Sequence, residues 1–94
     1  MFIRDIKEYE EIRSLDNAIL KELLHPSRDE VRIGYSVAYA RVETGEGTFL
    51  HRLKKSSEVY YILEGKEEMY IDGETREAPP GQIIYIPPNS IQKI

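Results

Sequence analysis

The sequence contains no cysteine and no tryptophan. Without cysteine the chain has no disulfide, no thiolate zinc site and no cysteine nucleophile, so a metal would need nitrogen or oxygen ligands. The sequence also lacks an apolar run close to the roughly 18 residues that a membrane-spanning helix needs. The stretch from Met1 to Glu11 mixes charged and apolar residues and has no signal-peptide core. We therefore expect a cytoplasmic protein with no membrane partner.

Positive charge is in short supply, with 13 Lys and Arg against 17 Asp and Glu and a formal net charge of −4. This balance argues against nucleic acid as a partner, because nucleic-acid binding relies on a surplus of lysine and arginine near the phosphates. The 94 residues suffice for one small domain and are too few for two. We therefore expect a single folded domain over residues 1–94.

The first 30 residues carry helical signals. Asp5 followed by Glu8 has the form of a capping box, and apolar residues then recur at three-residue spacing, which predicts a short helix over Asp5–Arg13. The segment Ala18–Leu24 is rich in helix formers and is closed by Pro26. Intrinsic propensity alone therefore favours a helix there as well.

From Val31 onward the pattern changes to that of β-strands. Apolar and aromatic residues occupy every second position over 31–39, which predicts a strand. More strands are expected over 48–53, 59–63, 69–71 and 82–86, separated by turns such as Asp72–Gly73. Residues 59–63 are apolar or aromatic throughout, which predicts burial on both faces. Short strands separated by turns indicate an all-β sandwich or barrel.

Two features predict self-association. Residues 90–94 have the pattern of one more strand, yet no later element is available to pair with it, and an open strand edge invites a partner. Val59, Tyr61 and Leu63 would give the outer face of their strand more apolar surface than is normally left in water. We therefore expect a homodimer, with strand exchange as one route to it.

One histidine and one glutamate are the main candidates for chemistry. Phe49, His51 and Leu53 alternate on one face of their predicted strand, and Glu58 shares a face with Tyr60 on the next. Pairing of the two strands would bring the His51 imidazole near the Glu58 carboxylate. Such a pair is a start for a divalent metal site or a general base, and the alternative is a polar group held by hydrogen bonds.

Two motifs run through this region. GEGTFLHRLKKSSEVYYILEG follows the pattern G-x5-H-x-H-x3-4-E-x6-G at every fixed position except the second histidine, which is Leu53 here. GETREAPPG follows the pattern G-x5-P-x-G through Gly73, Pro79 and Gly81. Both motifs, in this order, resemble those of the cupins. The resemblance covers residues 31–92.

The cupin resemblance implies an all-β double-stranded β-helix, a jelly-roll barrel, over 31–94. Residues 1–30 would then form an arm of one helix and one strand, with Ala18–Leu24 joining the sheet as a strand despite its propensity. Members of the family continue for further strands that close the barrel. The barrel here is therefore expected to be incomplete or to be closed by a partner chain.

The resemblance also implies a ligand set. In cupins two histidines and the glutamate of the first motif, with a later histidine, hold a divalent metal, commonly manganese, iron, nickel or zinc. Leu53 replaces one histidine and Gln92 stands at the expected place of the last one. The implied metal ligands are His51, Glu58 and Gln92, a weaker set than tightly held transition metals usually have.

Two functions follow from the resemblance, and neither assigns a catalytic residue. The first is a binding module that keeps the barrel pocket for a small polar ligand, sugar-like or anionic, with Tyr60 and Tyr39 as substrate-binding pocket walls. The second is a metal-dependent enzyme resembling the sugar-phosphate isomerase or dioxygenase branches of the cupins, with the ion as a Lewis acid. The replacement of two histidines favours the binding module.

Overall fold

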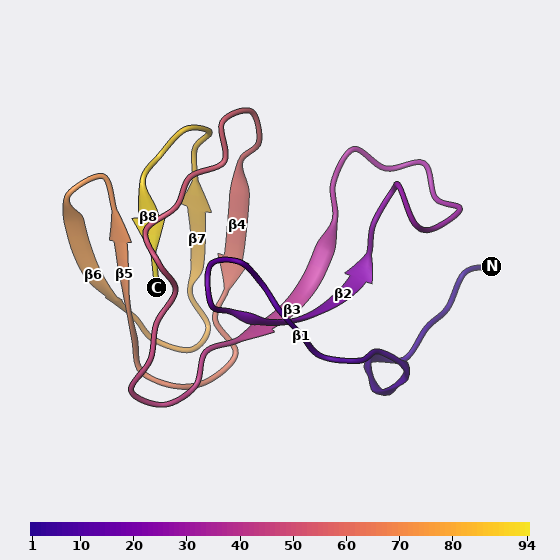
Figure 1. Cartoon of the computed structure of the whole chain (residues 1–94), viewed down its shortest axis with the longest axis horizontal. Coiled ribbons are helices and arrows are strands. Elements are labelled where there is room, and N and C mark those ends of the chain that lie inside the picture. Colours follow the sequence, from indigo (N-terminus) through magenta and orange to yellow (C-terminus); the bar gives the residue numbers. More distant parts are fainter. The chain divides into compact units, whose positions relative to one another are not determined.

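The computed structural model describes residues 1–94, and its regular secondary structure consists of eight β-strands and one 3-10 turn. The chain divides into two units, Met1–Glu46 and Gly47–Ile94, which are described separately (Figure 1). The all-β prediction is confirmed, while the predicted boundary between arm and barrel at residue 30 stays a prediction. The structure contains no helix with the length and hydropathy to cross a bilayer.

The unit Met1–Glu46 is built on an antiparallel sheet with the order β1-β2-β3. Its strands are β1 (Ile12–Arg13), β2 (Ile19–Leu24) and β3 (Val37–Arg41). The β2 sequence is rich in helix formers, yet its backbone pairs with a strand on each side. This pairing overrides the intrinsic propensity, so the strand implied for this segment is present.

The short helix predicted over Asp5–Arg13 is reduced to one 3-10 turn, η1 (Ile6–Glu8). The Asp5 side chain caps this turn by accepting a hydrogen bond from the Lys7 backbone N–H at 2.8 Å. The prediction of a longer helix is wrong, because the chain pairs with β2 from Ile12 onward. Strand pairing takes the backbone groups that a continued helix would have used.

The strand predicted over 31–39 begins only at Val37, so the prediction is wrong for residues 31–36. The register explains the difference. A bulge lies between Glu22 and Leu24, and Leu24, the last residue of β2, is already paired with Val37. The residues before Val37 have no β2 partner. Alternating apolar residues indicate the two faces of a strand, but a strand also needs a neighbouring strand to pair with.

Asp29 anchors the segment between β2 and β3. Its side chain is 2% exposed and accepts hydrogen bonds from the His25 backbone N–H at 3.1 Å and from the Arg28 guanidinium at 2.7 Å. The Arg28 hydrogen bond, supported by that of His25, lowers the pKa of the Asp29 carboxyl to about 2. A buried carboxylate needs such partners. Asp29 therefore holds His25 and Arg28 of the same segment in place.

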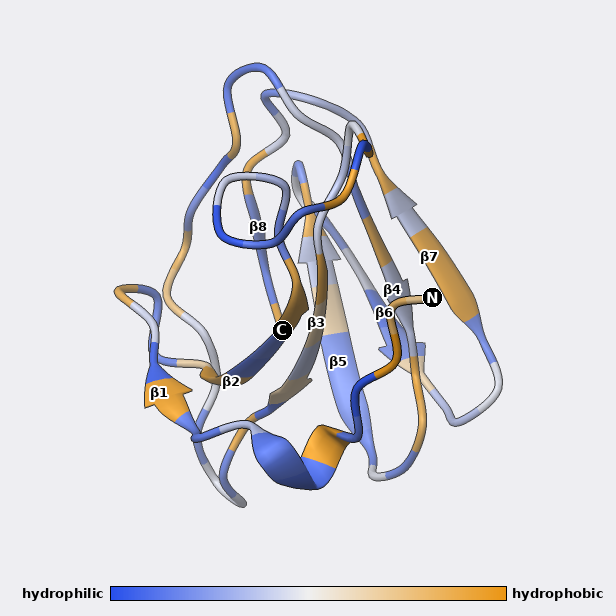
Figure 2. Cartoon of the chain, turned by 90° about the vertical axis from the view of Figure 1, so that its right-hand side faces the viewer, coloured by the Kyte–Doolittle hydropathy of each residue, from blue (hydrophilic) through white to orange (hydrophobic).

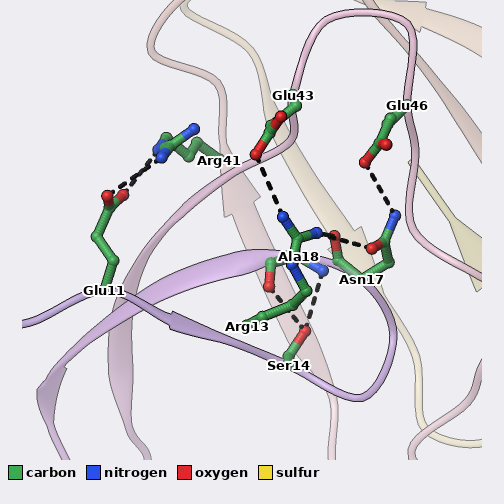
Figure 3. Close-up of polar contacts among 8 residues, drawn as sticks. All are labelled: Glu11, Arg13, Ser14, Asn17, Ala18, Arg41, Glu43 and Glu46. Atoms are coloured by element: carbon green, nitrogen blue, oxygen red, sulfur yellow. Dashed lines mark hydrogen bonds and ion pairs between the residues drawn. The ribbon is translucent and has the colours of Figure 1, made fainter.

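Polar contacts align the ends of β1 and β3 (Figure 3). The Arg13 guanidinium lies 3.2 Å from a carboxylate oxygen of Glu43 and donates to the Asn17 side-chain oxygen at 2.8 Å. Arg41 donates to both carboxylate oxygens of Glu11, and this hydrogen bond lowers the pKa of the Glu11 carboxyl. These pairs are exposed to solvent, so they contribute strand alignment more than stability.

The unit Gly47–Ile94 contains two antiparallel sheets. In one, β4 (Glu58–Tyr61) pairs with β7 (Ile83–Ile86). In the other, β5 (Glu67–Ile71) lies between β6 (Glu74–Ala78) and β8 (Gln92–Lys93). A buried cluster joins the two sheets, because its members come from β5, β6, β7 and the residue after β4; these are Met69, Ala78, Ile86 and Ile62.

The β5-β6 hairpin contains the turn predicted at Asp72–Gly73. Both residues have positive φ, 46° and 88°, as a two-residue type I′ turn requires. The sequence has no strand signal for β6, because its residues are polar and only Ala78 is buried. The tight turn places β6 beside β5 in a fixed register, so the strand forms without an apolar pattern of its own.

The C-terminal segment does have partners, and the expectation that residues 90–94 lack one is wrong. β8 pairs antiparallel with β5, with Gln92 opposite Ile71. The Gln92 backbone also exchanges two hydrogen bonds with His51, and Ile94 O accepts the Thr48 N–H at 2.8 Å. These partners lie far upstream in the sequence, where no local pattern indicates them.

The strand predicted over 48–53 is also wrong, because only an isolated bridge at His51 forms there. Its backbone hydrogen bonds with the C-terminal segment are too irregular for a continuous ladder. The predicted burial of 59–63 on both faces is wrong as well. Tyr60 is half-buried and Ile62 is buried, whereas Val59 and Tyr61 are exposed. β4 therefore has one face toward the core and one toward solvent.

Candidate ligand site around Gln92

Gln92 contacts both of the other residues that the cupin resemblance implies as metal ligands, His51 and Glu58. It is 1% exposed, and its backbone donates to the His51 carbonyl at 2.9 Å and accepts from the His51 N–H at 3.0 Å. Its side-chain Nε2 donates a hydrogen bond to Oε1 of Glu58 at 2.8 Å. His51, Glu58 and Gln92 are therefore neighbours, joined once through the backbone and once through side chains.

Strand β8 is held in place by the turn between β5 and β6. The Asp72 carboxylate accepts the Ile91 backbone N–H at 2.8 Å, and the Asp72 N–H donates to the Ile91 carbonyl at 2.9 Å. Ile91 and Lys93 are exposed, so alternation along the strand turns Gln92 inward. The sequence indicated Asp72 only as a turn residue, and its contact with the residue before Gln92 was not predicted.

The orientation of the Gln92 amide follows from the chemistry of Glu58. An ionised carboxylate only accepts hydrogen bonds, so the amide nitrogen must face it. The amide oxygen, Oε1, is then buried and has no hydrogen-bond partner. An unsatisfied buried acceptor costs about 1–3 kcal/mol. The site therefore contains an inward acceptor that a hydrogen-bond donor would stabilise.

His51 contributes a half-buried imidazole whose tautomer can be assigned from its neighbour. Its Nδ1 lies 2.7 Å from the Phe49 carbonyl oxygen, which can only accept. Nδ1 therefore carries the hydrogen, and in the neutral ring Nε2 carries the lone pair.

The residues of the site do not fit a tightly held transition metal. No group of three His, Cys, Asp or Glu side chains in the structure could hold an ion. Gln92 directs its amide nitrogen, which cannot ligate, toward Glu58, so its one ligating atom points elsewhere. Leu53 has no donor atom at all. One imidazole and one carboxylate are fewer strong donors than such metals require.

The predicted pocket tyrosines lie in different units. Tyr60 is on the same face of β4 as Glu58 and packs against the buried cluster of its unit. Tyr39 is half-buried in β3, opposite Lys21, in the unit Met1–Glu46. Their role as pocket walls stays a prediction.

Comparison with known proteins identifies the family. The family model described as Cupin domain matches residues 38–93. The chain belongs to the cupin family. It is also 42% identical over 90 residues to the uncharacterized protein MJ1618 of Methanocaldococcus jannaschii, a match that covers 93% of this chain and 71% of that protein. No solved structure matches the chain.

Membership confirms the cupin identification made from the two motifs. The matched range includes His51, Glu58 and Gln92, so the candidate site lies inside the cupin domain of this chain. A cupin domain is compatible with many chemistries, and the function must be argued from the residues of the site. In this cupin the buried Gln92 amide donates a hydrogen bond to the Glu58 carboxylate.

Proposed function

We propose that this cupin binds a small, hydroxyl-rich ligand, a polyol or a sugar, at Glu58 and His51 without a tightly held metal. The observation that supports this function is the hydrogen bond from Gln92 Nε2 to Glu58 Oε1 at 2.8 Å. It fixes a half-buried carboxylate with a neutral amide donor. The amide uses one acceptor position, so the carboxylate keeps most of its accepting capacity for a ligand.

The remaining atoms favour a ligand that donates hydrogen bonds. The Gln92 amide occupies one acceptor position of the Glu58 carboxylate, and the remaining lone pairs of that carboxylate can accept hydrogen bonds from a ligand. Hydroxyl groups of a polyol can satisfy such acceptors, whereas an anion would be repelled by the carboxylate. We therefore narrow the earlier choice between sugar-like and anionic ligands to the sugar-like class.

The strength of binding can be bounded. Each hydrogen bond to a charged group contributes about 1.5–3 kcal/mol, and a neutral one about 1 kcal/mol. A ligand held by a few such bonds, after the cost of immobilising it, would bind with a dissociation constant on the order of 0.1–10 mM. Screening must therefore use a method that detects weak complexes.

The test is a titration of the isotope-labelled chain, followed by NMR, with glucose, mannitol and glycerol, and with acetate as the anionic comparison. We expect saturable shifts of the backbone amides of His51, Glu58 and Gln92 with a polyol and none with acetate. Glu58→Gln should weaken binding at least about 10-fold, since it removes the charge that strengthens the hydrogen bonds.

The matched control is Glu68→Gln, because Glu68 is an exposed glutamate on β5. It should leave the titration unchanged. The proposal is wrong if none of the three polyols shifts these amides, or if the Glu58 and Glu68 variants bind equally well.

The metal-dependent alternative makes a different prediction. An isomerase or dioxygenase of the cupin type would require the ion to supply Lewis acid chemistry, and this chain would have to hold it through His51 and Glu58. Turnover of a sugar phosphate that depends on added Mn²⁺ or Fe²⁺ and disappears in His51→Ala would favour that alternative.

A further inference from the structure

A cavity of about 390 Å³ lies within the unit Met1–Glu46. The N-terminal segment, residues 2–9, forms one side of its wall. The other side comes from the end of β2 and the start of β3, through Leu23, Leu24 and Val37. The volume lies near the lower end of the range for small-molecule pockets. The residues of the candidate ligand site belong to the other unit, so this cavity is a separate feature.

Two hydrogen bonds hold the N-terminal segment against β2. The Tyr9 hydroxyl donates to the Leu23 carbonyl at 2.6 Å, and Lys21 Nζ donates to the Ile6 carbonyl at 3.4 Å. Figure 2 shows apolar stretches in orange alternating with polar ones in blue from the N-terminus to η1. The apolar side chains of this segment line the cavity. Because the wall is fixed in the free chain, a ligand would not have to order it on binding.

The cavity wall is apolar except at one position. Apart from Arg4, every side chain that lines the cavity is aliphatic or aromatic, and no Asp or Glu is among them. Small-molecule pockets commonly combine such an apolar wall with a few polar groups that orient the ligand. Arg4 is therefore the residue that determines the charge of a matching ligand.

The Arg4 guanidinium keeps donors for a ligand. It lies 3.7 Å from Oδ1 of Asp29, which is beyond hydrogen-bond distance, and 4.9 Å from the centre of the Phe2 ring. Arg28 donates to the same Asp29 carboxylate at 2.7 Å, so Asp29 does not depend on Arg4 as its partner. The Arg4 side chain is 43% exposed. A guanidinium in this position can donate two parallel hydrogen bonds to an incoming carboxylate.

We propose that this cavity binds a small amphiphilic carboxylate, with its carboxylate on Arg4 and its short apolar tail between the N-terminal segment and β2. A cationic ligand would be repelled by Arg4. A polyol would leave hydroxyl groups unpaired against the apolar wall, which is costly. The inference is independent of the polyol site proposed at Glu58, because the two sites share no residue and require opposite ligand chemistry.

The experiment is a titration of the isotope-labelled full chain, followed by NMR, with octanoate, 1-octanol and octylamine up to about 2 mM. These probes have the same tail and differ in the charge of the head group. We expect octanoate to shift the backbone amides of Tyr9, Leu24 and Val37 saturably, with a dissociation constant below about 0.5 mM. 1-Octanol should bind at least about 3-fold more weakly, and octylamine at least about 10-fold more weakly.

Substitution of Arg4 separates its charge from the shape of the cavity. Arg4→Gln should weaken octanoate binding at least about 5-fold and leave 1-octanol binding unchanged, a split that damage to the fold would not produce. Arg32→Gln is the matched control, because Arg32 is exposed in the same unit and does not line the cavity. It should leave both titrations unchanged.

A second variant leaves Arg4 in place. Ile3 lines the cavity and is 77% exposed, so Ile3→Glu should preserve the circular dichroism spectrum while its negative charge weakens octanoate binding at least about 5-fold. Leu15→Glu, at a fully exposed position outside the cavity, should have no effect.

Three results would overturn the proposal. The first is that 2 mM octanoate leaves the amides of Tyr9, Leu24 and Val37 unshifted or shifts only amides of the unit Gly47–Ile94. The second is that octylamine binds as tightly as octanoate. The third is equal octanoate affinity in Arg4→Gln and Arg32→Gln.

Discussion

Gln92 donates a hydrogen bond of 2.8 Å from its side-chain amide to the Glu58 carboxylate, and the rest of its side chain is buried. The cupin resemblance implied that these two residues would share a metal ion. In the structure they contact each other directly, with nitrogen toward oxygen. The amide satisfies the carboxylate in the way that a cation would, but without charge, and this arrangement makes the site a set of hydrogen-bond acceptors.

The first prediction concerns the identity of residue 92. Gln92→Glu places a second carboxylate against Glu58 in a buried position, so the free energy of unfolding at pH 7 should fall by several kcal/mol, about 3 or more. Gln92→Leu removes the bond and the unsatisfied oxygen together, so its loss should be smaller, about 1–2 kcal/mol. Urea unfolding of both variants measures the difference. A leucine variant less stable than the glutamate variant would contradict the assigned contact.

The second prediction concerns the missing histidines. Restoring them with Leu53→His and Gln92→His should create a site of three imidazoles and one carboxylate. Calorimetric titration with Ni²⁺ or Zn²⁺ should then show affinity at least about 100-fold higher than in the natural sequence. Leu50→His with Gln92→His is the control, since residue 50 is outside the motif. Equal metal affinity of the two double variants would show that the motif positions do not converge.

The third prediction concerns Asp29 and acid stability. Because the folded pKa of Asp29 is lowered to about 2, its carboxylate binds fewer protons in the folded state than in the unfolded state. Its contribution is fully present above the unfolded pKa near 3.9 and is lost as the pH falls from about 4 to 2. Thermal unfolding across this window should show a falling midpoint in the natural chain. Asp29→Asn should be less stable at pH 6 and should have a flatter profile below pH 4; a parallel profile would rule out this role of Asp29.

The fourth prediction concerns the turn that positions β8. Asp72→Ala removes the hydrogen bond to the Ile91 N–H and places alanine at a φ of 46°. The unfolding free energy should fall by about 1–3 kcal/mol, and the Gln92 amide should exchange its hydrogen faster. Asp72→Asn, which keeps an accepting oxygen and tolerates this φ, should restore most of the stability. If the Gln92 amide hydrogen exchanges at the same rate in both variants, Asp72 does not position Gln92 and the prediction is wrong.

Part of this account was predictable from the sequence. The first motif contains His51 and Glu58, and the cupin resemblance placed Gln92 in the same domain. The turn at Asp72–Gly73 followed from local backbone preference. Such features depend on residues that are close together in the sequence, so local sequence patterns are sufficient to predict them.

The remainder depends on partners distant in the sequence. Residues 31–36 alternate as a strand does but have no pairing strand, whereas the polar β6 forms because a tight turn brings it to β5. The last residues found partners in β5 and at His51 that no local pattern indicates. The direction of the Gln92 amide follows only when Glu58 is known to face it.

The most direct test of the central claim is elemental analysis of the chain purified without chelator and without an affinity tag that carries metal, with His51→Ala prepared alongside. The account predicts that both proteins contain far less than one equivalent of any transition metal, because Gln92 and Leu53 supply no strong ligand. One equivalent of a transition metal in the natural chain that disappears in His51→Ala would contradict it.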